Sequence, residues 1–531
     1  MPIPPHADHH ALRVSSWPLH FERLTEAASM ALAADLARIL KQGDVVALDG
    51  DLGAGKSTFA RALLRAKADD PFLEVPSPTF TLVQTYDYED FEISHFDLYR
   101  VGDFEELYEI GFEESWLTGA ALVEWPERAK DLMPSDALWI TIETTENVGE
   151  RRLIMSGTPV WQQRLERLGQ KRKLLNCRGW SEALLKPIDG DLSPRSYDRV
   201  TRLALDPDGQ PLATNPDEKA PSAQSAILMD MPARQPGPEL PDGRLYDTVA
   251  HRVTDLPPVV TITEGLDHLG LRVPDIYGFD LDAGLLLWED FGTERLTGSD
   301  GNPIDERYLA VVKCLAQLHD KTIPNAFDGA GGRHVLPRYD LEAFKVELDV
   351  FLDFYWPHTH RAPCPEVERH DFHALWQPLL TLLVDSERSL VLRDVQDPNC
   401  FWLGEGHRPG AIGFIDFQDC LIGPTAYDLS ALALDARVTI PDDLQDLMFA
   451  HYVSLRNLDD LQTAEFKQTY CLAAAQRISK NLGAFARAAD LAGRTGYLEH
   501  VPRSLKYLCK VLELPLLSGL KDWYDTHDLL G

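Results

Sequence analysis

The chain has 531 residues, of which 44% are hydrophobic and 25% charged, and its net charge is −33. This length predicts two to four domains, and the composition is typical of a soluble globular protein. The acidic balance argues against broad, non-specific binding of nucleic acid, because phosphate repulsion would not be offset over an extended face. The sequence has no eighteen-residue apolar run and no signal-peptide pattern at its start, and its seven cysteines are scattered. We therefore expect a cytoplasmic protein without a membrane span.

Helical and strand patterns alternate over the first third of the chain. Apolar residues at helical spacing alternate with short apolar runs, which favours an α/β sheet domain ending near residue 160. The histidine cluster HADHH at 6–10 is expected to be a polar terminus and not a metal site. The predicted elements are helices at 25–42, 57–68 and 160–177 and strands at 44–50, 80–88, 91–100 and 120–128.

The segment GDLGAGKS, Gly50 to Ser57, matches the pattern G-x-x-x-x-G-K-[ST] in full. It lies between an apolar strand and a helix, where glycines let backbone N–H groups surround phosphate oxygens and the helix adds its positive dipole end. Lys56 can reach the β- and γ-phosphates, and the Ser57 hydroxyl can ligate Mg²⁺. Asp97 and Glu124 end apolar strands, where a P-loop sheet presents acidic groups to the metal. Taken singly, each is more often an ordinary strand-end carboxylate.

Five segments in this order, GDLGAGKSTFAR, SPTFTLVQTY, HFDLYR, ELYEIGFEE and LVEWPER, together resemble the TsaE family. This family is the ATPase subunit of the bacterial machinery that makes threonylcarbamoyladenosine on tRNA, and the resemblance covers about residues 15–170. It implies that this part hydrolyses ATP together with two partner proteins. The partners would contact the tRNA, and this chain would contact it only indirectly. It also implies Lys56 on phosphate, Ser57 and Glu124 on Mg²⁺, and Asp97 near the metal and the attacking water. The nucleotide-binding residues that it implies are Gly50, Asp51, Leu52, Gly53, Ala54, Gly55, Lys56, Ser57, Thr58 and Trp125, with Ser77 and Thr79 in a mobile loop.

The pattern changes from about residue 176 onward. A strand, a long polar loop and a second strand are predicted over 198–232, and GLLLWEDFG at 284–292 predicts another strand. Beyond 305 the chain is mostly helical, with helices at 306–321, at 341–356 and several after 440. A β-containing piece followed by a large helical piece predicts a two-lobed domain.

Two segments of this second part carry the residues that a phosphotransferase needs. Asp394 and Asn399 in LVLRDVQDPNCFWL fit D-x-x-x-x-N, and Asp416 ends the next apolar strand, AIGFI. In a phosphotransferase one carboxylate orients the acceptor hydroxyl, while an amide and a second carboxylate hold Mg²⁺ on the ATP phosphates. Asp394 is therefore predicted as the base, with Asn399 and Asp416 as metal ligands. Either segment alone fits a polar loop beside a core strand equally well. Asp428 is expected to support the loop.

This part of the chain, over about residues 185–440, resembles the aminoglycoside phosphotransferase and choline kinase superfamily. Its segments ILMDMP, GLRVPDIYGFD, LLLWEDFG, LAQLHD and IDFQD are most similar to the anomeric kinases of N-acetylmuramate and N-acetylglucosamine. The resemblance implies ATP and Mg²⁺ as cofactors. It also implies that LLWEDFG is a hinge strand whose backbone around Glu289 to Phe291 contacts adenine.

The match departs from the superfamily pattern at two places. The histidine two residues before the catalytic aspartate is replaced by Leu392, and Met229 and Asp230 stand where a phosphate-binding lysine is usual. Arg195 or Arg199 could reach the phosphates instead, although a solvent-facing arginine is at least as good an interpretation.

The predicted fold is an α/β P-loop NTPase domain (15–170) followed by a two-lobed α+β kinase-like domain (178–531). The second domain would divide into an N-lobe at about 178–300 and a helical C-lobe at about 301–531. The predicted function is bifunctional: an ATPase for tRNA modification and a kinase of an amino sugar in cell-wall recycling. Two alternatives stay open. The second half could be a pseudokinase that binds a ligand and regulates the first, or a kinase of another alcohol, such as an aminoglycoside or choline.

Overall fold

The structure is a computed structural model of the whole chain, and it describes residues 17–102, 104–147, 149–180, 183–188, 195–201, 225–404 and 411–531. The histidine cluster at 6–10 and most of the polar loop predicted within 198–232 lie outside these residues. The chain divides into two compact units. The first comprises Met1–Gly190, Arg195–Asp230 and Tyr277–Trp288, and the second comprises Asp191–Pro194, Met231–Ile276 and Glu289–Gly531. Among the described residues, no helix has the length and apolar character that crossing a bilayer requires.

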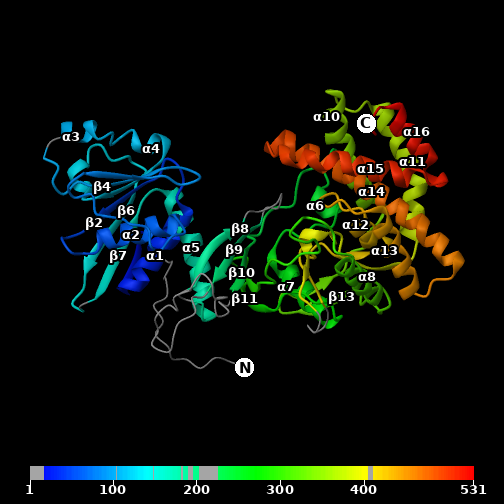
Figure 1. Cartoon of the computed structure of the whole chain (residues 1–531), viewed down its shortest axis with the longest axis horizontal. Helices are drawn as coiled ribbons and strands as arrows, with labels where there is room; N and C mark the ends of the chain where they lie inside the picture. The colour runs from blue at the N-terminus through cyan, green and yellow to red at the C-terminus, as the bar shows by residue number, and fades with distance from the viewer. Residues whose placement is uncertain are drawn as a thin grey trace. The chain divides into compact units, whose positions relative to one another are not determined.

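A seven-stranded sheet in the order β1-β7-β6-β2-β5-β4-β3 forms the centre of the P-loop part of the first unit (Figure 1). Strand β2 pairs in parallel with β5 and β6, and β4 pairs in parallel with β5, whereas β1, β3 and β7 add antiparallel pairs. The strands are β1 (Leu19–Thr25), β2 (Val45–Asp49), β3 (Val83–Tyr86), β4 (Ile93–Asp97), β5 (Ala120–Glu124), β6 (Leu138–Thr144) and β7 (Glu150–Ser156).

Both faces of this sheet are covered, as the continuous apolar runs of its parallel strands require. Val46 and Leu48 belong to a core with α1 and α2, whereas Val45 belongs to a core on the other face with α3 and the 3₁₀ turn η1. Thr25 caps α1 by accepting a hydrogen bond from the Ala28 amide. The predicted helices at 25–42, 57–68 and 160–177 are confirmed. The helices are α1 (Glu26–Ile39), α2 (Lys56–Lys67), α3 (Phe104–Glu109), α4 (Ser115–Thr118), η1 (Pro126–Ala129) and α5 (Pro159–Cys177).

Helix α5 packs against two different sheets of the first unit. Trp161 and Leu165 join the core of the seven-stranded sheet, whereas Leu174 and Leu175 join the core of a five-stranded sheet in the order β11-β12-β10-β9-β8. A buried bidentate ion pair ties Arg172 of α5 to Asp35 of α1. The sheet is built from β8 (Leu184–Ile188), β9 (Ser196–Thr201), β10 (Ser225–Asp230), β11 (Ile276–Asp280) and β12 (Leu285–Glu289).

The second unit is mainly helical, as predicted. Its described helices are α6 (Tyr246–Val249), α7 (Leu256–His268), α8 (Asp305–His319), α9 (Leu341–Val350), α10 (Trp356–His360), α11 (Glu366–Asp385), α12 (Ala426–Ala433), α13 (Asp442–Leu455), α14 (Asp460–Ala492), α15 (Val501–Leu512) and α16 (Ser518–Thr526), with a π-helical turn at Phe351–Tyr355. Short antiparallel pairs join β13 (Ala326–Gly329) to β14 (Gly332–Val335), β15 (Arg388–Val391) to β18 (Leu421–Pro424), and β16 (Cys400–Trp402) to β17 (Ile412–Phe414).

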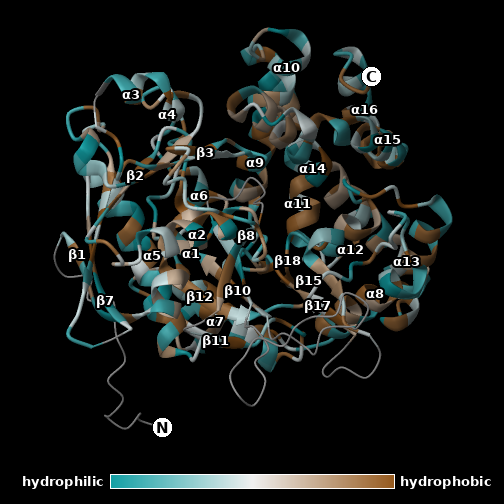
Figure 2. Cartoon of the chain, turned by 60° about the vertical axis from the view of Figure 1, so that its left-hand side comes forward, coloured by the Kyte–Doolittle hydropathy of each residue, from teal (hydrophilic) through white to brown (hydrophobic). Residues whose placement is uncertain are grey.

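The long helix α14 lies among the other helices of this unit, and apolar residues colour α11 beside it (Figure 2). Gly483 lets α14 approach the end of α9, because a Cβ at this position would come within 2.2 Å of the Val350 carbonyl oxygen. Among the buried residues of α14 are Gln476, Arg477 and Lys480. Burying such groups is costly unless they are paired, so this face of α14 marks a polar interior beside the loop that follows β15.

Candidate functional sites

The predicted phosphate loop joins the end of β2 to the start of α2. Gly50, Gly53 and Gly55 all have positive φ (144°, 81° and 112°), a conformation that other residues adopt only with strain. At Gly50 space adds a second constraint, since a Cβ would lie 2.3 Å from the Ile142 carbonyl oxygen. The loop therefore has the backbone geometry that turns amide groups toward a phosphate.

The Lys56 side chain curls back over its own loop. Its ammonium donates hydrogen bonds to the carbonyl oxygens of Gly50 (2.5 Å) and Asp51 (2.9 Å) and lies 3.6 Å above the ring of Trp125. Trp125 follows β5 in a left-handed conformation, with φ of 59°, which places the ring over the loop. Burial lowers the pKa of Lys56. The structure thus brings the predicted lysine and tryptophan together.

Ser57 and Glu124, the predicted Mg²⁺ ligands, are in direct contact. The Ser57 hydroxyl donates to one Glu124 carboxylate oxygen at 2.9 Å, and Nε2 of His95 lies 2.9 Å from the other. His95 and Glu124 are both buried. His95 lies two residues before Asp97 on β4, so its side chain emerges on the same face of the sheet. This histidine belongs to the HFDLYR segment of the sequence, but the sequence alone predicted no role for it.

Asp97 is held by two hydroxyl groups of the predicted loop. Ser77 and Thr79 donate to the same Asp97 oxygen at 3.1 and 2.9 Å. Asp97 and Glu124 are direct register partners at the ends of the parallel strands β4 and β5. The two carboxylates therefore emerge side by side at the sheet edge that also carries the phosphate loop.

A cavity of about 130 Å³ adjoins the phosphate loop on the side of α1 and β7. Arg151 of β7 lines it and braces the loop by donating from Nε to the Ala54 carbonyl at 2.7 Å. Thr58 also faces the cavity. Arg151 is a second residue that sequence reasoning missed, since it lies about a hundred positions beyond the loop that it contacts. The other residues that line the cavity are Glu26, Ser29, Met30, Gly53, Gly55, Phe59, Ile142, Gly149 and Leu153.

The second candidate site lies in the loops after β15 and β17. The Asn399 amide donates to the Asp394 carbonyl at 2.9 Å, and the Ile415 amide donates to the Asn399 carbonyl at 3.0 Å, which places Asp416 next to Asn399. Arg393 and Asp416 have positive φ (74° and 59°), an uncommon conformation that clusters at functional sites. The structure thus assembles Asp394, Asn399 and Asp416 around one pair of short strands.

The buried Asp428 carboxylate supports this loop. It accepts hydrogen bonds from the backbone amides of Leu392 (2.6 Å) and Arg393 (2.9 Å). Burial raises the pKa of Asp428 to about 7, although these hydrogen bonds act in the opposite direction. Leu392, in the place of the usual histidine, is packed in the core. Asp428 was predicted to support this loop, and in the structure it does so through these two hydrogen bonds.

Asp394 is surrounded by cations. Burial alone would raise its pKa, but Lys480, Arg252, Arg477 and Arg393 together lower it to about 2. The carboxylate is thus ionised at every physiological pH, and it is suited to orienting a hydroxyl group and accepting its proton as the reaction proceeds.

The predicted hinge segment, residues 286–292, overlaps the end of β12, and its predicted adenine contact begins at the last residue of that strand, Glu289. The Glu289 carboxylate accepts two hydrogen bonds from Arg272 (2.5 and 2.6 Å), and the Glu289 amide donates to the Asp275 carbonyl at 2.9 Å. The Phe291 ring packs against Phe401 with centroids 5.6 Å apart. Because the Phe291 ring packs against Phe401, the predicted adenine contact at Phe291 concerns its backbone atoms and stays a prediction.

No lysine of β10 replaces the missing phosphate ligand. Met229 is buried, and Asp230 on the same strand binds Arg167 and Lys171 of α5. Arg199 lies in β9, opposite Ile227 of β10 in register. Arg195 directly precedes that strand. Whether either arginine reaches phosphate stays a prediction.

The oxygen ligands at both sites suit Mg²⁺, which prefers one or two carboxylates completed by phosphate oxygens and water. The predicted ligands are Ser57 and Glu124 in the first site and Asn399 and Asp416 in the second. Among the described residues, no three His, Cys, Asp or Glu side chains are grouped to hold a metal by themselves.

These two constellations define the class: one chain with a P-loop ATPase site and a kinase-type phosphotransfer loop. Residues 24–153 match the family model for threonylcarbamoyl adenosine biosynthesis protein TsaE, and residues 221–465 match that of the phosphotransferase enzyme family. The chain belongs to the TsaE family through its first part and, through its second, to the phosphotransferase family that includes the N-acetylmuramate/N-acetylglucosamine kinases.

Three relatives illustrate this double membership. The TsaE protein of Rickettsia conorii is 41% identical over 123 residues, which is 23% of this chain and 70% of that protein. The N-acetylmuramate/N-acetylglucosamine kinase of Caulobacter vibrioides is 27% identical over 373 residues, 68% of this chain and 97% of that protein. The kinase of the same name from Pseudomonas aeruginosa is 31% identical over 264 residues, 48% of this chain and 72% of that protein. The predicted families, fold class and use of ATP and Mg²⁺ are confirmed.

Proposed function

We propose that the chain is a bifunctional enzyme: the ATPase component of tRNA threonylcarbamoyladenosine modification and an ATP-dependent kinase of an amino sugar. The observation that supports the proposal is that one chain brings Lys56, Ser57 and Glu124 together at a phosphate loop and, separately, Asp394, Asn399 and Asp416 at a kinase-type loop. We further propose functional boundaries at 15–170 and 178–531, an N-lobe ending near 300, and action in the cytoplasm. The amino-sugar kinase would serve cell-wall recycling.

In the first site the chain's own residues hold the nucleotide and position water. Lys56 and the loop amides neutralise the phosphates, and Ser57 and Glu124 hold Mg²⁺. When bound, Mg·ATP supplies the phosphoanhydride that is cleaved. Asp97, fixed by Ser77 and Thr79, orients the attacking water. The cavity beside Thr58 and Arg151 receives the nucleoside.

The tRNA-modifying role is tested in cells depleted of their own TsaE subunit. The full chain is expected to restore threonylcarbamoyladenosine in tRNA through the two partner proteins of the complex, and Lys56→Ala is expected not to. The Asp394→Asn chain is the control and is expected to restore it. A soluble full chain that fails to restore the modification would refute the first half of the proposal.

In the second site Asp394 orients the acceptor hydroxyl while Asn399 and Asp416 hold Mg²⁺ against the phosphates. The hydroxyl oxygen forms a bond to the γ-phosphorus, the bond from that phosphorus to the bridging oxygen breaks, and ADP leaves. The proton passes to Asp394 and then to solvent. The names of the relatives support an N-acetylated amino sugar as acceptor, and we propose its anomeric hydroxyl as the nucleophile.

The alternatives are a pseudokinase and a kinase of another alcohol. Leu392 and the absent β10 lysine favour the first. The assembled Asp394, Asn399 and Asp416 oppose it, as does the Asp428 carboxylate that braces the loop. The test is a screen of the full chain with ATP against N-acetylmuramate, N-acetylglucosamine, aminoglycosides and choline, with the phosphate position read by NMR. Turnover of N-acetylated amino sugars at the anomeric oxygen supports the proposal. No turnover of any acceptor would favour a pseudokinase, and turnover of aminoglycosides or choline alone would favour another alcohol kinase.

A further inference from the structure

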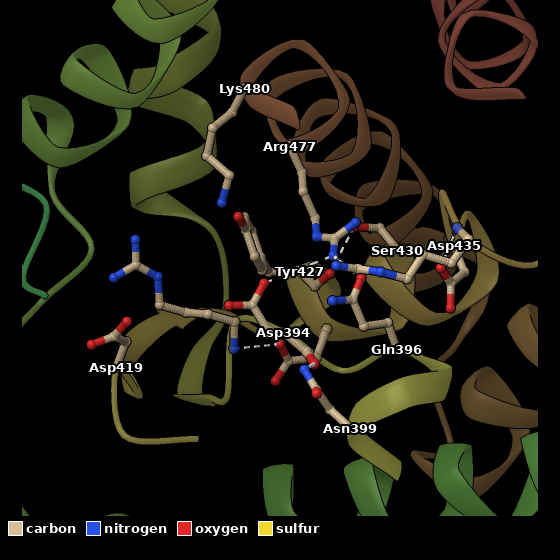
Figure 3. Close-up of polar contacts among 12 residues, drawn as sticks. Asp394, Gln396, Asn399, Asp419, Tyr427, Ser430, Asp435, Arg477 and Lys480 are labelled. Atoms are coloured by element: carbon tan, nitrogen blue, oxygen red, sulfur yellow. Dashed lines mark hydrogen bonds and ion pairs between the residues drawn. The ribbon is translucent and has the colours of Figure 1, made fainter. Parts of the chain in front are cut away.

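Two cations on one face of α14 project toward Asp394. Arg477 and Lys480 are three residues apart, so their side chains emerge on the same side of the helix. They are 3% and 8% exposed. Figure 3 shows both side chains extending from α14 toward the loop that carries Asp394.

The other cations of this interior already have carboxylate partners. Arg393 binds one oxygen of the buried Glu347, and Arg252 donates to Asp419 at 2.7 Å. The second Glu347 oxygen accepts from the Tyr339 hydroxyl and from the Gln476 amide, the latter at 3.2 Å. Both hydrogen-bonded oxygens of Glu347 are therefore engaged by groups other than Lys480.

Lys480 and Arg477 have no hydrogen-bonded carboxylate partner within the described part of the chain, and their ion pairs with carboxylates are longer. The Lys480 ammonium lies 3.8 Å from Glu347 Oε1, and an Arg477 guanidinium nitrogen lies 3.9 Å from Asp394 Oδ1, both beyond hydrogen-bond distance. Arg477 donates to the neutral Gln396 side chain at 3.2 Å, while its buried Nε has no partner there. A buried donor without an acceptor, such as Arg477 Nε, costs free energy and therefore calls for an explanation.

These cations lie on the acceptor side of Asp394. In Figure 3, Asn399 and Lys480 lie on opposite sides of Asp394. Since Asn399 is a proposed Mg²⁺ ligand, the phosphates of ATP belong on its side. Asp394 is 25% exposed and Arg252 27%, so solvent reaches this part of the interior. Burial lowers the pKa of Lys480 to about 8, which leaves the ammonium mostly charged at neutral pH.

We propose that Lys480 and Arg477 bind a carboxylate group of the acceptor and thereby select an acidic amino sugar over a neutral one. This inference rests on the proposed kinase function of the second site. N-acetylmuramate and N-acetylglucosamine form a matched pair for it, because both carry an anomeric hydroxyl and an N-acetyl group but only the first carries a carboxylate.

The experiment compares kcat/KM of the full chain for these two sugars. Lys480→Met is expected to lower the ratio of kcat/KM for N-acetylmuramate to that for N-acetylglucosamine by about tenfold or more, because hydrogen bonds between charged groups are among the strongest in proteins. Lys480→Arg, which keeps the charge, is expected to retain most of the ratio. Lys467→Met is the matched control: Lys467 is on the same helix, and its ammonium lies over the rings of Phe449 and Tyr470.

The possible outcomes distinguish failure of this inference from failure of the proposed kinase function. Equal loss on both sugars would show that Lys480 only positions Asp394, and a raised KM for ATP would assign it to the phosphates; either result overturns the inference and leaves the kinase standing. Turnover of neither sugar by the wild-type chain overturns both. If Lys480→Met does not fold, Arg477→Gln provides the same comparison, with the same expected fall in the ratio.

Discussion

The two ATP sites of this chain differ in where their ligands come from. In the P-loop site the proposed phosphate ligands are contiguous in sequence: backbone amides and the start of α2 would supply them, and the glycines at 50, 53 and 55 give the loop its backbone path. In the kinase-like site, Asp394 and Asn399 come from the loop after β15 and Asp416 from the loop after β17, and hydrogen bonds and a buried interior of paired charges hold these loops. A backbone site depends on local conformation, whereas a side-chain site depends on tertiary packing. Variants should therefore affect the two sites separately.

The largest expected effect is that of Asp394→Asn on phosphotransfer. Turnover of the amino sugar should fall on the order of a hundredfold or more, since general-base help is typically worth about 10²–10⁴-fold. Binding of ATP should change little, because Asn399 and Asp416 hold the metal. Asp416→Asn is the comparison and should weaken binding of Mg·ATP itself, measured by calorimetric titration. Near wild-type turnover in Asp394→Asn would mean that the assigned base is wrong.

Lys56→Ala should remove ATP hydrolysis by the first site and leave sugar phosphorylation nearly intact. Loss of one charge-stabilising donor costs on the order of 10²–10³ in rate. Both activities are measured on the same purified chain, so the second serves as the control for folding. Equal loss of both activities would contradict the independence of the sites.

Arg172→Met tests the link that α5 makes between the two sheets of the first unit. Removing one partner of a buried ion pair leaves the other uncompensated, which typically costs about 3–5 kcal/mol. We expect the denaturation midpoint of this unit to fall accordingly, because Asp35 stays buried between α1 and α5. Replacing both residues, as Arg172→Met with Asp35→Leu, should recover most of the loss. An unchanged midpoint in Arg172→Met would show that α5 packs without this pair.

The smallest expected effect is a pH dependence of acceptor selection. Because burial lowers the pKa of Lys480 to about 8, its charge is present below that pH and is lost as pH rises through it. KM for N-acetylmuramate should rise several-fold from about pH 7 to about pH 9, and KM for N-acetylglucosamine should rise less. The charged groups facing Lys480 are Glu347 from α9, Arg393 and Asp394 from the loop after β15, and Arg252 from the loop after α6. Parallel profiles for the two sugars would contradict the prediction.

The sequence predicted what is local. Each of three features combines a short motif with an adjacent apolar strand: the phosphate loop, the strand ends at Asp97 and Glu124, and the D-x-x-x-x-N loop. The residues next to each motif in sequence could therefore be placed beside it in the fold. The hydrogen bond between Ser57 and Glu124 is the outcome of two adjacent parallel strands, which the α/β pattern already indicated.

The remaining features depend on contacts between distant segments. Arg151 reaches the phosphate loop from another strand, and α5, predicted only as a helix at 160–177, packs on the five-stranded sheet as well as on the seven-stranded one. Lys480 lies about ninety positions beyond Asp394, in a helix whose apolar pattern predicts only that one face is buried. His95 could have been predicted as a site residue. It lies two residues before Asp97 on the same strand, so its side chain faces the same side of the sheet, next to Glu124.

The central claim is that one chain carries two separate Mg·ATP sites. The most direct test is the stoichiometry with which the full chain binds a non-hydrolysable ATP analogue in the presence of Mg²⁺, measured by equilibrium dialysis. We predict two molecules per wild-type chain, one for Lys56→Ala, one for Asp416→Asn, and none for the double variant at concentrations that saturate the wild type. A wild-type stoichiometry of one, or loss of all binding in either single variant, would contradict the claim.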